Sequence, residues 1–164
     1  MKRTILLLLF VALLATSCDP EWALNPKNEG RAYIINRAET DITFKSYSFF
    51  SGRLHYQYDI SVGDTVCVSG SSWDERSNYW QKLVKAGWEP FLDVIANSDY
   101  QHESGELQYL FPTISILTSS TDSLSWTLDV NNIEENSIFN ESNWIKEESN
   151  DGYHNLYSWY YICE

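Results

Sequence analysis

The sequence has few basic residues. Its 164 positions hold 11 lysines and arginines against 23 acidic residues, which gives a net charge of −12. This shortage excludes binding to a nucleic-acid phosphate backbone, because such binding needs clustered positive charge. The 7 glycines never cluster beside a lysine, which excludes a phosphate-binding loop. No apolar run reaches the roughly 20 residues of a membrane-spanning helix, so we expect none.

Signatures of catalysis and of metal binding are also missing. The three histidines, His55, His102 and His154, are scattered, and none stands at zinc-ligand spacing from a cysteine. There is no EF-hand loop and no Gly-x-Ser-x-Gly nucleophile elbow. We therefore expect a non-enzymatic protein without metal or cofactor. A small hydrolase is the alternative that a cleft with paired, perturbed carboxylates would favour.

The N-terminus has the pattern of a secretory address. Two basic residues, Lys2 and Arg3, precede an apolar run of ten residues over 5–14, which is the length of a signal-peptide core. Small residues at 15–17 then lead directly into Cys18, and this resembles a bacterial lipobox. We expect residues 1–17 to be removed and Cys18 to be lipidated, so that the lipid is the membrane anchor. An ordinary signal peptide followed by a chance cysteine is the alternative.

The rest of the chain divides into a tether and one domain. Residues 18–30 contain two prolines and several acidic residues, which predicts a flexible tether. From residue 31 to 164 the apolar residues mostly recur with a period of two, and the 18 tryptophans and tyrosines favour strands. The clearest strands cover 54–60 and 124–130, and Asp151-Gly152 predicts a hairpin turn between two strand-like runs.

These patterns predict an all-β fold, an antiparallel β-sandwich of the immunoglobulin-like kind with one short helix. The helix is expected to begin after Ser77, with Tyr79, Trp80, Leu83 and Val84 on its apolar face and Gly87 just past its end.

The chain resembles small surface lipoproteins of the Bacteroidota, whose molecular function is unknown. The resemblance rests on Cys18-Asp19-Pro20-Glu21, which is similar to the acidic export signal of that phylum, and on the stretch 137–144 with the tyrosine-rich strand after it. It implies a single β-sandwich domain, anchored by lipid in the outer membrane and exposed on the cell surface. Thr65 and Ser123, each between an aspartate and an apolar residue, resemble O-glycosylation acceptors of the phylum.

An aromatic cluster is the candidate binding site. Trp73, Tyr79, Trp80 and Trp88 fall within sixteen residues, beside Asp74, Glu75 and Arg76. Indole rings with a guanidinium nearby can stack on a sugar ring and bond its hydroxyls, which indicates Trp73, Trp88 and Arg76 as ligand contacts. We expect Trp73 to be exposed in a serine-rich loop. The alternative is that the predicted helix folds onto the sandwich and buries these rings.

Two cysteines remain if Cys18 is lipidated. Cys67 and Cys163 both lie in strand-like runs, and an oxidising compartment would allow a disulfide between them. Two buried free thiols are the alternative.

Two functions remain open at this stage. The first is a glycan- or ligand-binding module at the cell surface, which exposed tryptophans would favour. The second is a structural or adhesin-like module of a surface protein assembly, which a long unpaired strand edge would favour.

Overall fold

The computed structural model describes residues 27–47, 52–73, 90–96, 113–118, 123–129 and 131–164. The expected signal peptide, Cys18 and the predicted helix after Ser77 lie outside these ranges. The first strand begins at Lys27, four residues before the expected start of the domain at Arg31. This boundary is therefore corrected, since residues 27–30 belong to the domain.

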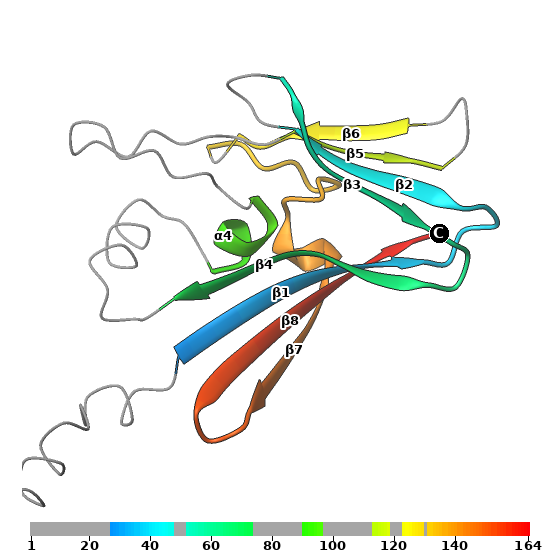
Figure 1. Ribbon diagram of the computed structural model, residues 1–164. Helices are drawn as coiled ribbons and strands as arrows, with labels where there is room; N and C mark the ends of the chain where they lie inside the picture. The colour runs from blue at the N-terminus through cyan, green and yellow to red at the C-terminus, as the bar shows by residue number, and fades with distance from the viewer. Residues whose placement is uncertain (1–26, 48–51, 74–89, 97–112, 119–122, 130) are drawn as a thin grey trace, which may run out of the picture.

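The described residues form two four-stranded sheets that pack face to face (Figure 1). In the first sheet the order is β4-β1-β8-β7, with bounds β1 Lys27–Asn36, β4 Thr65–Trp73, β7 Ile145–Asn150 and β8 His154–Cys163. In the second sheet the order is β3-β2-β5-β6, with bounds β2 Ile42–Tyr47, β3 Leu54–Ile60, β5 Thr113–Leu117 and β6 Ser123–Thr127.

The expected all-β sandwich with one short helix is confirmed, and two details refine it. The second sheet is wholly antiparallel, but β1 runs parallel to β8, so the first sheet is mixed. The strand order also differs from the immunoglobulin arrangement, because β1 lies between β4 and β8 instead of beside β2.

The alternation of buried and outward-facing residues explains why β1 forms a strand inside the first sheet. Every second residue of β1, from Asn28 to Asn36, is buried, and the residues between them face outward. The hairpin predicted at Asp151-Gly152 is confirmed, because β7 and β8 pair antiparallel across it. Gly152 has a φ of 89°, a left-handed conformation that glycine adopts without strain.

The two sheets meet at one end and diverge at the other (Figure 1). At the closed end, the fully buried Asn36 of β1 donates from its side-chain amide to the carbonyl oxygens of Ile60 (2.9 Å) and Thr40 (3.0 Å). At the open end, helix α4 (Pro90–Ala96) lies between the sheets. Its Phe91 ring contacts the rings of Trp144 (5.4 Å) and Trp159 (5.8 Å) edge-on. The helix therefore fills part of the space between the diverging sheets.

The sequence analysis did not predict α4, although proline is favoured in the first turn of a helix. Its close contact with β1 explains Gly30. A Cβ atom at that position would overlap the side chain of Val94 in α4 and lie 2.9 Å from the Trp73 ring. Glycine therefore lets the helix approach the sheet.

The proposed disulfide between Cys67 and Cys163 is not formed. Cys67 pairs with Tyr33 and is exposed on the outer face of the first sheet, whereas Cys163 pairs with Asn36 and is buried on the inner face. β1 separates their strands, which places them about 10 Å apart across the sheet alone, beyond the roughly 7 Å that a disulfide can bridge. The prediction of a bridge is wrong, and so is the alternative that both thiols are buried.

Candidate functional site

The predicted aromatic site is not formed around Trp73. Trp73 is the last residue of β4, and it is 5% exposed. Its ring stacks on Tyr157 of β8 with 5.9 Å between centroids and 20° between planes. The expectation of an exposed Trp73 is therefore wrong, because β4 continues to this residue and turns its side chain toward the core. Trp88 and Arg76 lie outside the described residues.

A pocket of about 340 Å³ lies elsewhere, between β6 and the segment 128–139 that follows it. Apolar side chains from both parts contribute to its wall, among them Trp126, Ile133 and Phe139. Polar side chains that include Asp129, Asn132 and Glu134 also line it. Six of the ten lining residues are polar, so the wall is more polar than that of a typical small-molecule site, and this volume is at the lower end of the range of such sites.

The β5–β6 ladder positions Trp126. Trp126 pairs with Ile114, whose side chain is fully buried, so both residues point to the inner side of the second sheet. β6 is the edge strand there, and the diverging first sheet covers it incompletely (Figure 1). Leu124, on the same side, is 55% exposed. The Trp126 ring is half-buried, with Tyr161 against it edge-on at 6.4 Å, and so it is held from one side while it lines the pocket.

Local hydrogen bonds fix the polar part of the pocket. The Asp129 carboxylate accepts the backbone N–H of Asn131 (3.0 Å), and the Asp129 carbonyl accepts that of Asn132 (3.0 Å). An aspartate that bonds the backbone two residues later is a common turn-forming arrangement. The turn sets the direction in which the chain leaves β6.

Asparagine side chains brace the next part of the segment. The Asn143 amide donates to the carbonyl oxygens of Glu135 (2.8 Å) and Ser137 (2.9 Å). Asn140 caps the short 3₁₀ helix η1 (Glu141–Asn143), because its side chain accepts the N–H of Ser142 (3.0 Å). These bonds satisfy backbone groups that no strand partner reaches.

Two tryptophan side chains anchor this part of the chain in the core. The Trp144 indole donates to the carbonyl of Ile138 (2.7 Å), and the Trp159 indole donates to the Glu141 carboxylate (2.9 Å). Ile138 and Phe139 are buried between these points. The pocket wall is therefore built on a braced segment, which indicates a preformed site.

The lining of the pocket carries negative charge. Asp129 and Glu134 contribute carboxylates, and no lysine or arginine is among the lining side chains of the described residues. Such a site disfavours anions. An indole ring beside carboxylate and amide groups can stack on the apolar face of a sugar and accept hydrogen bonds from its hydroxyls.

Sequence reasoning missed this site. Trp126 was recognised as part of a strand but not as a ligand contact. The available signal was the run of acidic and amide residues at 129–136, directly after a strand that ends in a tryptophan and a threonine. Contiguity alone does not show that the segment folds back beside its own strand.

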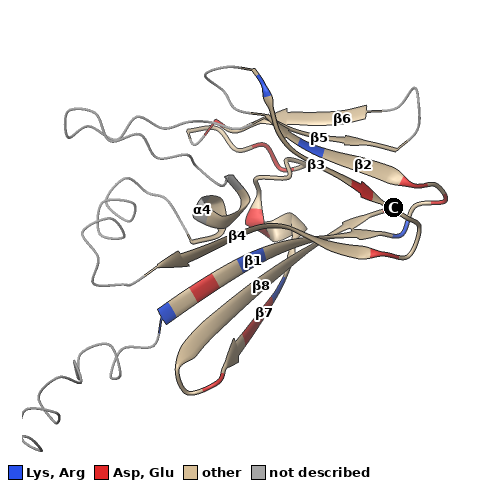
Figure 2. Ribbon diagram, in the orientation of Figure 1, with Lys and Arg blue, Asp and Glu red and all other residues tan. Residues whose placement is uncertain are grey.

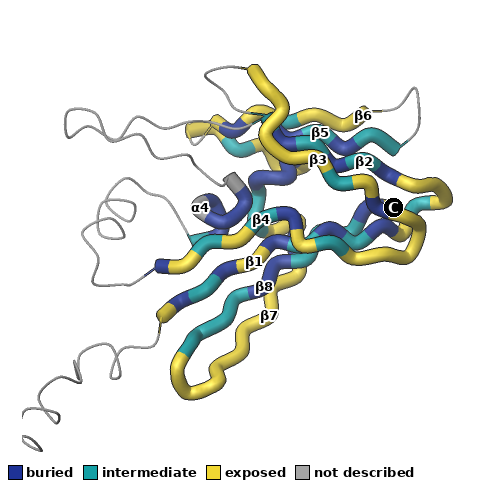
Figure 3. The backbone as a smooth tube through the Cα atoms, viewed as in Figure 1, coloured by how far each residue is buried: buried dark blue, intermediate teal, exposed yellow. Residues whose placement is uncertain are grey.

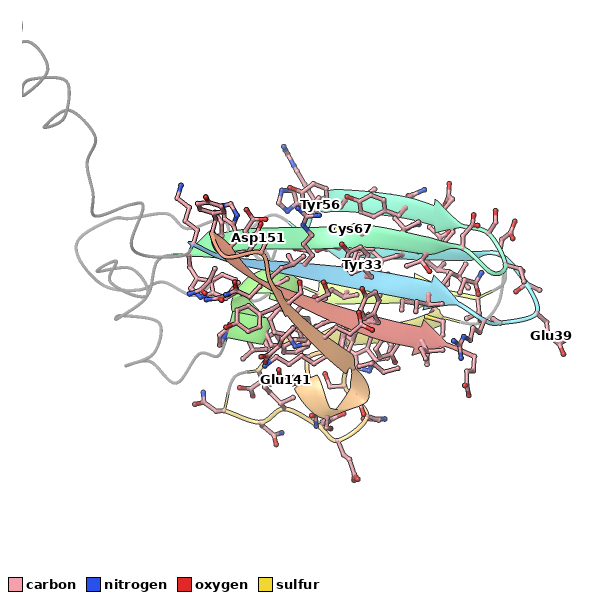
Figure 4. The ribbon with its side chains drawn as sticks, turned by 90° about the horizontal axis from the view of Figure 1, so that it is seen from below. Tyr33, Glu39, Tyr56, Cys67, Glu141 and Asp151 are labelled. Carbon is pink, nitrogen blue, oxygen red and sulfur yellow. The ribbon has the colours of Figure 1, made fainter. Side chains whose placement is uncertain are left out.

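A second aromatic feature lies on the outer face of the first sheet. Tyr33 and Tyr160 stack with 5.0 Å between ring centroids and 17° between planes. A hydrogen bond with Tyr33 raises the pKa of Arg31, and desolvation raises that of Tyr160. Figure 4 shows Tyr33 and Cys67 on this face. The side chains on this outer face form an open surface and not an enclosed site.

The remaining predicted residues are placed as follows. Thr65 and Ser123 are each the first residue of a strand, β4 and β6, and both are exposed. Their glycosylation remains a prediction. Among the described residues, no three histidine, cysteine or acidic side chains gather so that they could hold a metal ion.

The chain matches no protein-family model, no curated protein and no solved structure. Within the described ranges, no helix is long and apolar enough to cross a membrane.

Proposed function

We propose that this protein is a non-enzymatic surface lipoprotein that binds a glycan in the pocket beside Trp126. One observation carries the proposal. A half-buried indole, two carboxylates and an amide line a pocket of about 340 Å³ whose wall is braced by hydrogen bonds. Cys18 supplies the lipid anchor, and the domain faces outward from the outer membrane.

The chemistry of the pocket favours a neutral saccharide. A sugar ring has an apolar C–H face, which packs on indole, and hydroxyl edges, which hydrogen-bond to carboxylate and amide groups. A preformed site loses little conformational entropy on binding. This favours the affinity for a sugar, because a sugar buries little apolar surface. The carboxylates of Asp129 and Glu134 disfavour sulfated or sialylated glycans, because like charges repel.

The first test is an array of neutral and anionic glycans probed with the full-length chain. We expect binding to neutral glycans and at least a tenfold loss in Trp126→Ala. Because Trp126 is half-buried, a second variant avoids a folding artefact. Glu134→Gln removes a charge that lines the pocket, whereas Glu135→Gln removes a neighbouring exposed charge that does not.

We expect Glu134→Gln to weaken binding and Glu135→Gln to leave it unchanged, with equal melting temperatures. Equal binding by both glutamine variants and by Trp126→Ala would contradict the proposal. Release of free sugar from a bound glycan would instead favour the hydrolase alternative.

A structural or adhesin-like module is the second candidate. The observation that favours it is the outer edge of β3, which pairs with no further strand of the described residues and on which Leu54 is 49% exposed and Tyr56 is 37% exposed. An exposed edge can accept a partner strand.

A further inference from the structure

The start of β1 and the tip of the β7–β8 hairpin lie together at one end of the first sheet, here called the hairpin end. β1 runs parallel to β8, so Lys27 pairs with His154, and the Lys27 backbone N–H donates to the carbonyl oxygen of Tyr153 (3.2 Å). The ten residues of β1 lead from there to Asn36 at the closed end of the sandwich. At a rise of about 3.3 Å per residue, the two ends are about 30 Å apart.

The position of Cys18 in the sequence keeps the hairpin end close to a membrane anchor. Lys27 follows Cys18 by nine residues. A fully extended chain spans at most about 3.5 Å per residue, so Lys27 lies within about 30 Å of a lipid attached to Cys18. This step rests on the proposed lipidation of Cys18. The hairpin end must therefore stay near the bilayer, whereas the closed end is free to stand away from it.

The hairpin end carries an exposed aromatic side chain. Residues 150–153 are all exposed (Figure 3), and Tyr153, at 71%, is the most exposed large hydrophobic residue of the described ranges. The turn is braced, because the Asp151 carboxylate accepts the N–H of Tyr153 (2.8 Å) and the Asn150 side chain accepts that of Gly152 (2.6 Å). Tyrosine combines an apolar ring with a polar hydroxyl, which favours the interface between lipid and water.

The two ends of the sheet also differ in charge. Exposed acidic residues gather around the closed end, and Arg37 is the basic residue beside them (Figure 2). These acidic residues are Glu39, Asp41, Asp59, Asp64 and Glu164. At the hairpin end, Asp151 is accompanied by Lys27. An anionic lipid surface repels carboxylates within a Debye length of about 8 Å, so repulsion is smallest when the closed end points away from the membrane.

We propose that the β7–β8 hairpin faces the lipid bilayer and that the Tyr153 ring lies at the lipid–water interface. The first sheet then stands upright, with its closed end about 30 Å further from the membrane. The lipid on Cys18 supplies the affinity, because its buried CH₂ groups contribute far more than one tyrosine ring does. Tyr153 supplies the orientation, since it is a second point of contact at the same end of the domain.

Fluorescence quenching by a spin-labelled lipid tests this orientation. In the full-length Cys67→Ser protein, Tyr153→Cys and Val62→Cys each take one bimane label, while the buried Cys163 stays unlabelled in the folded protein. Val62 is the matched control, because it is also an exposed apolar residue in a turn, but at the closed end. The lipidated proteins are placed in vesicles that contain a lipid with a nitroxide near its headgroup. We expect quenching at position 153 to be at least about twice that at position 62, because the two positions differ in height by about 30 Å.

A second measurement separates the ring from the tether. In bilayer nanodiscs, a gadolinium-chelating lipid broadens the amide NMR signals of residues near the membrane. In the parent, the signals of Gly152 and His154 should broaden more than that of Gly63. Tyr153→Ser should reduce this broadening with an unchanged melting temperature, because the side chain is exposed, and Tyr153→Phe, which keeps the ring, should retain it.

The outcomes distinguish failure of the orientation from failure of the anchor. Equal quenching at positions 153 and 62, or stronger quenching at 62, would overturn the upright orientation. Unchanged broadening in Tyr153→Ser would overturn the contact through the ring. If the parent does not float with vesicles in a density gradient, the anchor itself fails, and the orientation fails with it. These measurements do not involve the Trp126 pocket, so the glycan proposal is tested separately.

Discussion

Gly30 carries the closest approach between α4 and the first sheet. Replacing it with alanine forces a methyl group against Val94 and Trp73, so we expect a loss of about 1–3 kcal/mol, as overpacking in cores usually costs. Gly70→Ala is the matched control, because the nearest atom to its added methyl would be a backbone oxygen at 3.4 Å. Urea denaturation of both variants measures the difference. Equal stability would contradict the packing of α4 described above.

The two thiols of the domain should react differently. Cys67 is exposed, while burial raises the pKa of Cys163 to about 11. At pH 7 a maleimide should therefore label Cys67 in the folded protein and Cys163 only after unfolding. Peptide mapping of the labelled protein checks this. A mass decrease of about two, from a Cys67–Cys163 disulfide, would show that the cysteines are bridged after all.

Cys18 is the residue on which the proposed anchoring depends. Cys18→Ala should abolish acyl-chain labelling and release the protein from the membrane fraction. Each buried CH₂ of a lipid contributes about 0.8 kcal/mol, so the anchor holds without protein contacts. Retention of the alanine variant in membranes after a salt wash would mean that something other than lipid holds it.

At the scale of elements, the β7–β8 hairpin depends on Asp151. Its carboxylate accepts the backbone N–H groups of Tyr153 (2.8 Å) and His154 (2.6 Å), and these bonds lower its pKa. A depressed pKa stabilises the fold above the unfolded-state value of about 3.9, and this contribution is lost as the pH falls through the folded value.

The Asp151→Ala variant should therefore have a lower melting temperature than the parent at pH 7. The difference between the two melting temperatures should become smaller toward pH 3. Asp151→Asn keeps an acceptor oxygen but no titration, so its melting temperature relative to the parent should rise on acidification. Thermal melts across this pH range measure both variants. A constant difference between parent and asparagine variant would show that the carboxylate does not support the turn.

The elements that the sequence predicted correctly are those governed by local pattern. Alternation predicted the strands around Tyr58 and Trp126, and Asp151-Gly152 predicted the hairpin. Trp73 was misplaced because the serines before it suggested a loop, whereas pairing with β1 extends β4 through them. α4 escaped prediction because seven residues show too little periodicity, and its burial depends on contact with β1 and β4, which are distant in the sequence.

The candidate site was harder to predict than the fold. The pocket arises because β6 is an edge strand under a diverging sheet, and because the 128–139 segment folds back on it. Both features depend on contacts between segments that are distant in the sequence. The residues that brace the segment, such as Asn143 and Trp144, act through carbonyl oxygens whose positions no sequence pattern specifies.

At the scale of the whole molecule, the two sheets of the sandwich lie close together at one end and apart at the other. Asn36 closes one end, α4 fills part of the other, and the Trp126 pocket lies beside β6, an edge strand of the second sheet. The Trp126 pocket lies at one margin of that sheet and the β3 edge at the other.

The most direct measurement of the central claim follows the tryptophan indoles by NMR. A ¹⁵N-labelled protein is titrated with glucose, galactose, mannose and N-acetylglucosamine, and with the best ligand of the array. We predict that the Trp126 indole resonance shifts on saturation, while those of the buried Trp144 and Trp159, whose N–H groups are already bonded, stay in place. The resonances of Asn132 should move with Trp126. Unchanged Trp126 and Asn132 signals, or shifts confined to Tyr33 and Tyr160 on the outer face, would contradict the pocket as the binding site.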